Sequence, residues 1–137
     1  MMNVLVTGGA GYIGSHVVEE LQKNGFTPIV YDNLSTGHAA AVPEEVQLVE
    51  GDIHDVAFLK HIMAQFEIDA VIHFAASSLV GESMENPSKY YFNNVEGSLH
   101  LLEAMKGAGV DYIVFSSTAA VYGEPQRVPI KEDSCLN

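Results

Sequence analysis

The chain of 137 residues has the size of one globular domain, so a second domain is excluded, and such a domain buries about two thirds of its unfolded surface. Its 6 basic and 18 acidic residues give a formal net charge of −12, which opposes binding to nucleic acid and to anionic membranes. No apolar run approaches the roughly 20 residues of a membrane-spanning helix, and no secretion signal opens the chain. We therefore expect a cytoplasmic protein with no membrane partner. The lone Cys135 excludes an internal disulfide and a cysteine-based metal clip.

The first apolar segment breaks into a glycine-rich turn and then resumes with helical spacing. Residues 3–7 predict a strand, and residues 11–24 predict a helix with an inner stripe of Ile13, Val17, Val18 and Leu21. Between and just inside these elements, Gly8, Gly11 and Gly14 are spaced three apart. A glycine turn that opens a helix presents free N–H groups and the positive end of the helix dipole, which attract a pyrophosphate. Gly14 lets the helix pack closely on the strand.

The second strand, predicted at residues 27–31, ends at Asp32. This acid follows Gly14 by 18 positions, close to the roughly 20 expected for the acid that binds an adenosine ribose. A carboxylate there accepts hydrogen bonds from a free 2′-hydroxyl and repels a 2′-phosphate, which favours NAD over NADP. The alternative is that Asp32 is only a turn residue before Asn33.

The β-α alternation continues to the end of the fifth strand. Further strands are predicted at 46–50, 70–74 and 112–115, and helices after Asp55 and from 87 to 105, the latter with a stripe of Tyr91, Val95, Leu99, Leu102 and Met105. Residues 81–83 and the tail 124–137 are expected to be loop. This pattern predicts an α/β fold, a Rossmann-like doubly wound parallel sheet of five strands in the order 3-2-1-4-5, with the first strand central.

In such a sheet, ligands bind at the carboxyl ends of the strands near the switch point. Ala75 and Ala76, at the end of the fourth strand, leave room for a cofactor, although close packing would explain them equally well. Asp52 and Ile53 follow the third strand and suit an adenine ring or a simple turn cap. Hydroxyl side chains at residues 116–118 suit a substrate or a loop cap. We expect His73 to be a hydrogen-bonded core residue, the other five histidines to lie on the surface, and no metal to be bound.

Seven motifs, taken together and in this order, resemble the UDP-glucose 4-epimerases of the extended short-chain dehydrogenase/reductase superfamily. They are Thr-Gly-Gly-Ala-Gly-Tyr-Ile-Gly-Ser-His (7–16), Asp-Asn-Leu (32–34), Glu-Gly-Asp-Ile (50–53), His-Phe-Ala-Ala (73–76), Val-Gly-Glu-Ser (80–83), Asn-Asn-Val (93–95) and Phe-Ser-Ser-Thr-Ala-Ala-Val-Tyr-Gly (115–123). The resemblance implies an NAD-dependent exchange of UDP-glucose and UDP-galactose through a 4-keto sugar.

The resemblance also implies roles for single residues. Thr118 matches the hydroxyl residue that hydrogen-bonds the reacting oxygen of the sugar, which makes it the one catalytic and substrate-binding candidate. Gly14 from the glycine turn and Ser116 from the hydroxyl run are added to the cofactor-contacting positions that the resemblance gives. Those positions are Gly8, Gly11, Tyr12, Ile13, Asp32, Asn33, Asp52, Ile53, Phe74, Ala75, Ala76 and Asn93.

The family's catalytic base is a tyrosine in a Tyr-x-x-x-Lys helix beyond the fifth strand, and the chain ends before such a helix. Tyr122 does not replace it, because the residue four positions later is Gln126. We therefore expect residues 1–123 to be an incomplete NAD-binding domain, truncated before a sixth strand and a substrate domain, and 124–137 to lead to the absent helix. The enzyme would be the longer protein, and the fragment inactive and self-associating or homodimeric. The alternatives are a noncatalytic dinucleotide-binding module, or another nucleotide-sugar oxidoreductase or dehydratase.

Overall fold

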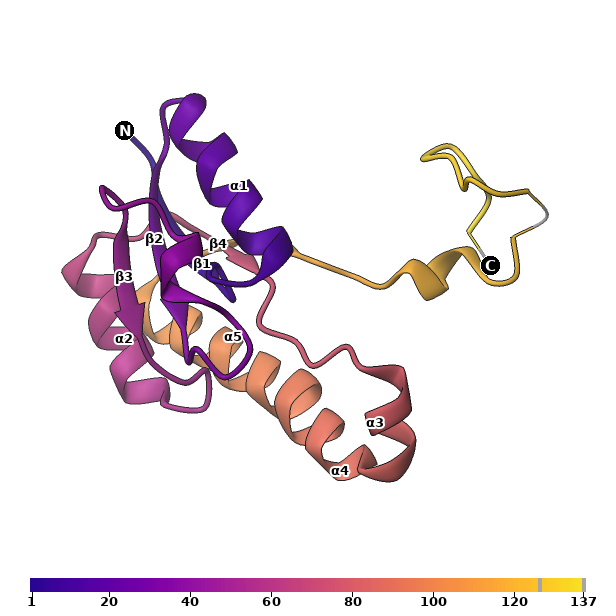
Figure 1. Cartoon of the computed structure of the whole chain (residues 1–137). Coiled ribbons are helices and arrows are strands. Elements are labelled where there is room, and N and C mark those ends of the chain that lie inside the picture. Colours follow the sequence, from indigo (N-terminus) through magenta and orange to yellow (C-terminus); the bar gives the residue numbers. More distant parts are fainter. Residues whose placement is uncertain (126, 137) are drawn as a thin grey trace.

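The fold is a parallel sheet with helices on both faces. It is seen in a computed structural model that describes residues 1–125 and 127–136. The sheet has five strands in the order β3-β2-β1-β4-β5 (Figure 1), which confirms the predicted order with β1 in the centre. The strands are β1 (Asn3–Thr7), β2 (Thr27–Asp32), β3 (Gln47–Glu50), β4 (Ala70–His73) and β5 (Tyr112–Phe115). Their bounds lie within one residue of those predicted.

The helices connect consecutive strands. The α-helices are α1 (Tyr12–Lys23), α2 (Val56–Gln65), α3 (Val80–Glu85), α4 (Pro87–Tyr90) and α5 (Gly97–Ala108). Two 3-10 turns, Ala39–Ala41 and Ala119–Tyr122, and one π-helical turn, Tyr91–Glu96, complete the elements. Among the residues that the structure describes, none of these helices is long and apolar enough to cross a membrane.

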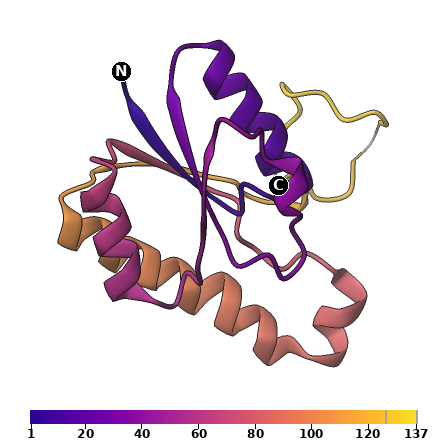
Figure 2. The same cartoon turned by 60° about the vertical axis from the view of Figure 1, so that its left-hand side comes forward.

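Alternating side chains of the central strand supply the two cores. Leu5 of β1 faces α2 and α5 and belongs to a buried cluster with Leu59 and Leu101. Its neighbours Val4 and Val6 belong to the cluster on the opposite face, the side of α1 (Figure 2). Because a strand buried on both faces must be apolar at successive positions, the run of valines and leucine in β1 fits its central place.

The structure differs from the expectations for Ile13 and for residues 81–83. Ile13 was expected to point inward from α1, but its side chain is 59% exposed, because it lies in the first turn of the helix, at the end of the sheet. Residues 81–83 were expected to be loop, but they belong to α3. That short helix is held by Tyr90, whose hydroxyl lies 2.7 Å from both the carbonyl oxygen of Leu79 and a carboxylate oxygen of Glu82.

The predicted long helix contains a break in register. It begins as α4, widens into the π-helical turn and continues as α5. The side chains that α5 buries are Leu101, Ala104 and Met105, which pack in the cluster with α2. Of the predicted stripe only Met105 is buried, and the exposed members are Tyr91, Val95, Leu99 and Leu102.

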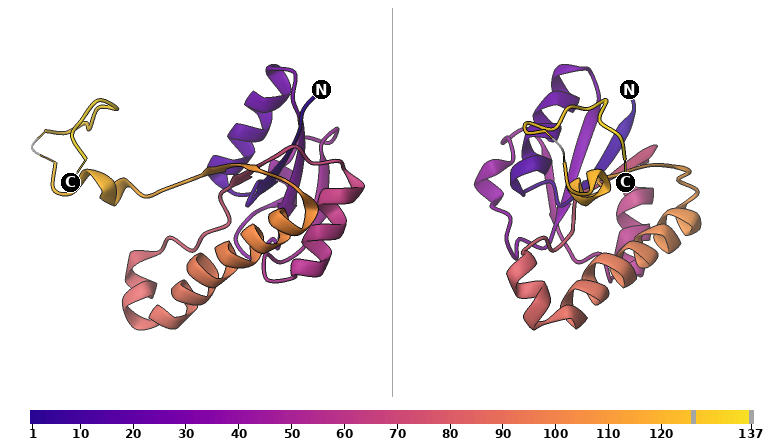
Figure 3. Two further views of the ribbon diagram at one scale, coloured as in Figure 1. Left: turned by 180° about the vertical axis from the view of Figure 1, so that it is seen from behind. Right: turned by 90° about the vertical axis from the view of Figure 1, so that its right-hand side faces the viewer.

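The last strand and the residues after it are poorly covered. All four residues of β5 are exposed. Beyond β5 the chain leaves the sheet as an extended arm that carries the 3-10 turn Ala119–Tyr122 (Figures 1 and 3). After this turn, the described residues 123–125 and 127–136 form neither helix nor strand, as expected, and residues 126 and 137 of the predicted tail lie outside the described residues. The division at residues 123 and 124 stays a prediction.

Candidate functional site

The glycine turn after β1 lies directly against the end of β4. Gly8 has φ +75°, a left-handed conformation that glycine adopts without strain. A Cβ on Gly8 would lie 2.6 Å from both the amide nitrogen of Ala75 and the carbonyl carbon of Phe74. The turn is also fixed to β2, because the Gly8 N–H donates to the carbonyl of Tyr31 at 2.9 Å. The glycine turn therefore lies between the ends of β2 and β4 at the carboxyl edge of the sheet.

The helix that leaves this turn is built to receive an anion. Gly11 is its N-cap and supplies no side chain to cap the first N–H groups, and the first turn carries no acidic residue. Those N–H groups and the helix dipole together attract a phosphate. A Cβ on Gly14 would collide with the backbone of the turn, at the carbonyl oxygen of Gly8. The structure thus refines the expectation for Gly14, since its missing side chain lets the helix pack on the turn itself.

Asp32 ties the glycine turn to the end of β2. Its side chain is only 7% exposed, and one carboxylate oxygen accepts the N–H of Ala10 at 3.0 Å. The other oxygen accepts the N–H of Leu34 at 2.8 Å, which holds Leu34 at φ 55°. The turn role is therefore present, yet each carboxylate oxygen has a second lone pair that can accept a hydroxyl.

Asp52 forms a second carboxylate turn, after β3. One of its carboxylate oxygens accepts the backbone N–H of His54 at 2.9 Å, and the other accepts the Asn33 side-chain amide at 3.2 Å. Partial burial disfavours the charged form, but the hydrogen bonds from His54 and Asn33 outweigh it and hold the pKa of Asp52 below its ordinary value. The phenol of Tyr31 donates to the Asp52 carbonyl at 2.9 Å, and burial raises the pKa of Tyr31. The Asp32-Asn33 and Asp52-Ile53 pairs therefore lie side by side.

The π-helical turn holds the loop after β4. Asn93 donates its side-chain amide to the carbonyl of Ala75 at 3.3 Å. Asn94 accepts the N–H of Ser77 at 2.8 Å and donates to the Ser77 carbonyl at 2.9 Å. The sequence predicts Asn93 as a site residue but indicates no role for Asn94. The side chain of Asn94 therefore fixes both the N–H and the carbonyl of Ser77, and so clamps the loop after β4 to the π-helical turn.

His73 is a core residue, as predicted. It is 3% exposed, and its Nδ1 lies 2.6 Å from the Thr7 hydroxyl while its Nε2 lies 3.2 Å from the Ser98 hydroxyl. The Ser98 hydroxyl already donates to the carbonyl of Asn94, so it accepts from Nε2–H, and Thr7 donates to Nδ1. This is a neutral tautomer, and burial lowers the pKa of His73 accordingly.

The structure separates the two hydroxyl candidates that follow β5. The Ser116 N–H donates to the carbonyl of His73 at 3.2 Å, so Ser116 stands at the carboxyl edge with the other site residues. Thr118 is the N-cap of the 3-10 turn Ala119–Tyr122, and its hydroxyl accepts the N–H of Ala120 at 3.2 Å. That turn lies in the extended arm (Figure 3). The structure does not bring Thr118 to the glycine turn, and its catalytic role stays a prediction.

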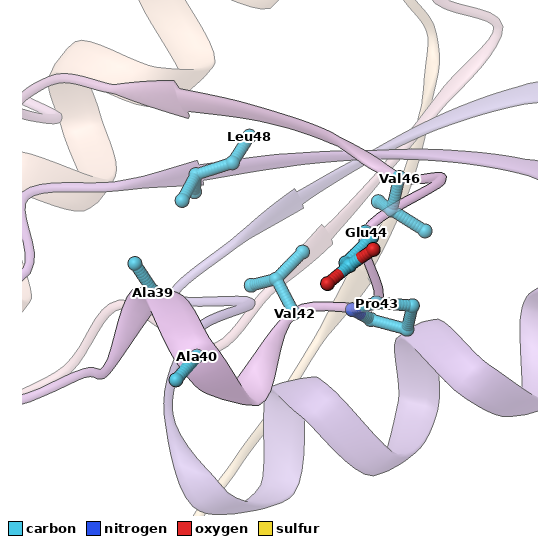
Figure 4. A pocket seen from close by; sticks show the side chains of 7 residues that line it. All are labelled: Ala39, Ala40, Val42, Pro43, Glu44, Val46 and Leu48. Atoms are coloured by element: carbon cyan, nitrogen blue, oxygen red, sulfur yellow. The ribbon is translucent and has the colours of Figure 1, made fainter.

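The structure also has a shallow hollow at the outer edge of the sheet, beside β3. Its volume is about 390 Å³, and none of the predicted cofactor-binding residues lines it (Figure 4). The lining residues are Ala39, Ala40, Val42, Pro43, Glu44, Val46 and Leu48. Within the described ranges 1–125 and 127–136, no group of three histidine, cysteine or acidic residues could hold a metal ion.

The chain is similar to known sugar-nucleotide enzymes. Residues 4–137 match the sequence model of the family described as NAD dependent epimerase/dehydratase family. The UDP-glucose 4-epimerase of Lactobacillus helveticus is 54% identical over 99% of the chain, and the chain covers 41% of that protein. In general the chain spans about two fifths of the length of the curated relatives it matches.

Solved structures give the same result. The UDP-glucose 4-epimerase from Brucella ovis in complex with NAD has a TM-score of 0.88 and 52% identity, and the match covers 100% of this chain and 42% of that one. The enzyme from Bifidobacterium longum in complex with NAD+ and UDP has a TM-score of 0.86 and 39% identity, with 99% and 43% covered. The chain belongs to the NAD dependent epimerase/dehydratase family.

Proposed function

We propose that the chain binds NAD across the carboxyl edge of its sheet, between the glycine turn and the end of β4. The observation that carries this proposal is what we call the Gly8 cradle: the glycine turn packs so closely on the backbone of Phe74 and Ala75 that no Cβ fits, and the uncapped start of α1 opens directly from it. The uncapped start of α1 is suited to the pyrophosphate, and Tyr12 and Ile13, both exposed there, stand free to cover it.

The remaining site residues suit the other parts of the dinucleotide. Asp32 and Asn33 would accept and donate hydrogen bonds at the adenosine ribose, and Asp52 with Ile53 would border the adenine. Phe74, Ala75 and Ala76 would line the nicotinamide half, where Asn93 already fixes the Ala75 carbonyl. When bound, NAD supplies a ring that can take a hydride from the substrate and return it.

We further propose that the whole protein is a UDP-glucose 4-epimerase, which interconverts UDP-glucose and UDP-galactose through a 4-keto sugar. Similarity to enzymes of that name supports this, and Thr118 would hydrogen-bond the reacting sugar oxygen. None of the six tyrosines in the sequence is followed four residues later by lysine. That observation favours the second candidate for the chain by itself, a noncatalytic dinucleotide-binding module.

The test is a calorimetric titration of the 137-residue chain with NAD and with NADP. We expect NAD to bind more tightly, and Asp32→Ala to weaken NAD binding about tenfold or more, since hydrogen bonds to charged groups contribute about 1.5–3 kcal/mol. Because Asp32 also holds the amides of Ala10 and Leu34, a second variant is needed. Asp32→Asn removes the charge but keeps only one acceptor oxygen, so it should relax the rejection of NADP while losing one of the two bonds to the amides of Ala10 and Leu34.

Asp111→Ala is the matched control, because it removes the same charge from an exposed residue at the amino end of β5. It should leave both affinities unchanged. An NAD-to-NADP affinity ratio that is the same in the parent chain, Asp32→Asn and Asp111→Ala would show that Asp32 is only a turn residue.

A further inference from the structure

His54 joins two parts of the candidate site that are far apart in the sequence. Its ring Nδ1 lies 2.6 Å from a carboxylate oxygen of Asp52. Its Nε2 lies 3.2 Å from the carbonyl oxygen of Phe92, in the π-helical turn. The ring also stacks on that of Phe92, with centroids 4.0 Å apart and planes inclined by 7°. The ring is therefore held on both edges and one face.

Both partners of the ring nitrogens are acceptors. A carboxylate has no proton to give at neutral pH, and a backbone carbonyl never has one. The Phe92 carbonyl also accepts the N–H of Gly97, five residues on, which is the bond that defines the π register. A neutral imidazole has one N–H and can satisfy only one of the two acceptors, whereas the imidazolium satisfies both.

The packing around the ring leaves little freedom for the two turns to move apart. A Cβ on Gly97 would collide with the Ile53 side chain and would come within 3.4 Å of the His54 ring. The titratable groups near the ring are Asp52 on its own turn and His100 on α5, whose ring meets it edge-on at 5.5 Å. Asp55 is engaged at the N-cap of α2, and Glu96 on the π-helical turn is exposed.

We propose that His54 is a positioning residue whose imidazolium form ties the Asp52 turn to the π-helical turn. The tie sets the spacing between Asp52, at the adenine end of the proposed site, and Asn93, which holds the Ala75 carbonyl at the other end. This inference rests on the proposed NAD binding. Loss of the proton leaves one ring nitrogen with a lone pair that faces the Phe92 carbonyl or the Asp52 carboxylate, and this loosens the spacing that the dinucleotide spans.

The first arm of the test is NAD affinity measured between about pH 5.5 and about pH 8.5, the range in which histidine changes its charge. For the parent chain we expect affinity to fall about fivefold from the acid to the alkaline end, since a charge-assisted hydrogen bond is replaced by a neutral or missing one. His54→Gln should bind weakly at every pH. His54→Arg, a permanent cation with several N–H donors, should bind tightly with a flat profile.

His61→Gln is the control, since His61 is an exposed histidine on α2, and it should keep the profile of the parent chain. The second arm needs no cofactor. Nitrogen-15 spectra of the imidazoles should show both nitrogens of His54 protonated at about pH 5.5. The amide signals of residues 91–97 should then shift as that proton is lost.

The outcomes separate the two proposals. A flat pH profile in a chain that does bind NAD, or a neutral His54 ring at acid pH, would overturn the role of His54. Absence of NAD binding at every pH would overturn the proposed function instead, and the ring and amide signals would still decide whether His54 ties the two turns.

Discussion

The sharpest test of the Gly8 cradle is the substitution Gly8→Ala, because two separate penalties can be worked out from the structure. An alanine at φ +75° adopts a left-handed conformation, which raises its free energy by about 1–2 kcal/mol. The new Cβ would also lie 2.6 Å from backbone atoms of Phe74 and Ala75, and such overpacking destabilises by about 1–3 kcal/mol. The free energy of unfolding should therefore fall by about 2–5 kcal/mol. This is a large part of the roughly 5–15 kcal/mol by which a domain is usually stable.

The chain supplies a matched control. Gly25, after α1, has φ +80°, and a Cβ there would meet no atom within 4 Å. Gly25→Ala should therefore carry only the conformational penalty of about 1–2 kcal/mol. Urea unfolding followed by circular dichroism gives the free energies of both variants, provided that the slope with denaturant stays the same. Thermal melts should show an additional fall of about 4 °C per kcal/mol for Gly8→Ala.

Equal losses in the two variants would show that the contact between Gly8 and β4 contributes no energy. A folded Gly8→Ala chain that binds NAD as tightly as the parent would show that the close packing of the glycine turn on β4 is not needed for cofactor binding.

Three further predictions concern activity, pH and assembly. The 137-residue chain supplied with NAD and UDP-galactose should show no epimerase turnover, because no tyrosine with a lysine four residues later is there to take the proton of the sugar hydroxyl; turnover by the purified chain would contradict this. Because burial lowers the pKa of His73, the unfolded chain takes up a proton at a higher pH than the folded chain, so the free energy of unfolding should fall as pH drops below about 6.5. In urea titrations His73→Gln should weaken this pH dependence, and an unchanged pH dependence would contradict the prediction. The exposed strand β5 should drive self-association, visible as concentration-dependent sedimentation with and without NAD, whereas a single monomer boundary at all concentrations would refute it.

The parts of the site that could be predicted from the sequence are those determined by local spacing or by topology. The glycine turn follows from three glycines and a strand-to-helix change, which involve only neighbouring residues. The strand order follows from right-handed β-α-β crossovers, and it brings Asp32, Asp52 and Ala75 to one edge without any knowledge of side chains.

The missed residues act across long distances in the sequence. Asn94 clamps Ser77, 17 positions away, and His54 reaches the Phe92 carbonyl, 38 positions away. No periodicity reports such pairs. His54 was expected on the surface because a single histidine after a strand forms no periodic pattern. The one local signal is Asp52, since an aspartate often accepts the backbone N–H of the residue two positions later and so forms a turn with it.

The face that α5 buries could not be predicted for a different reason, which bears on assembly. The segment from the π-helical turn through α5 carries two apolar stripes, one with Leu101 and Met105 and one with Leu99 and Leu102. Periodicity identifies a stripe but does not say which one is buried, and the π-helical turn shifts the register of α5 relative to α4. The first stripe packs against α2, while the second remains exposed together with Tyr91. A helix that is apolar on two sides is typical of one that is covered on both, so the second stripe, like β5, is a surface on which the chain should associate.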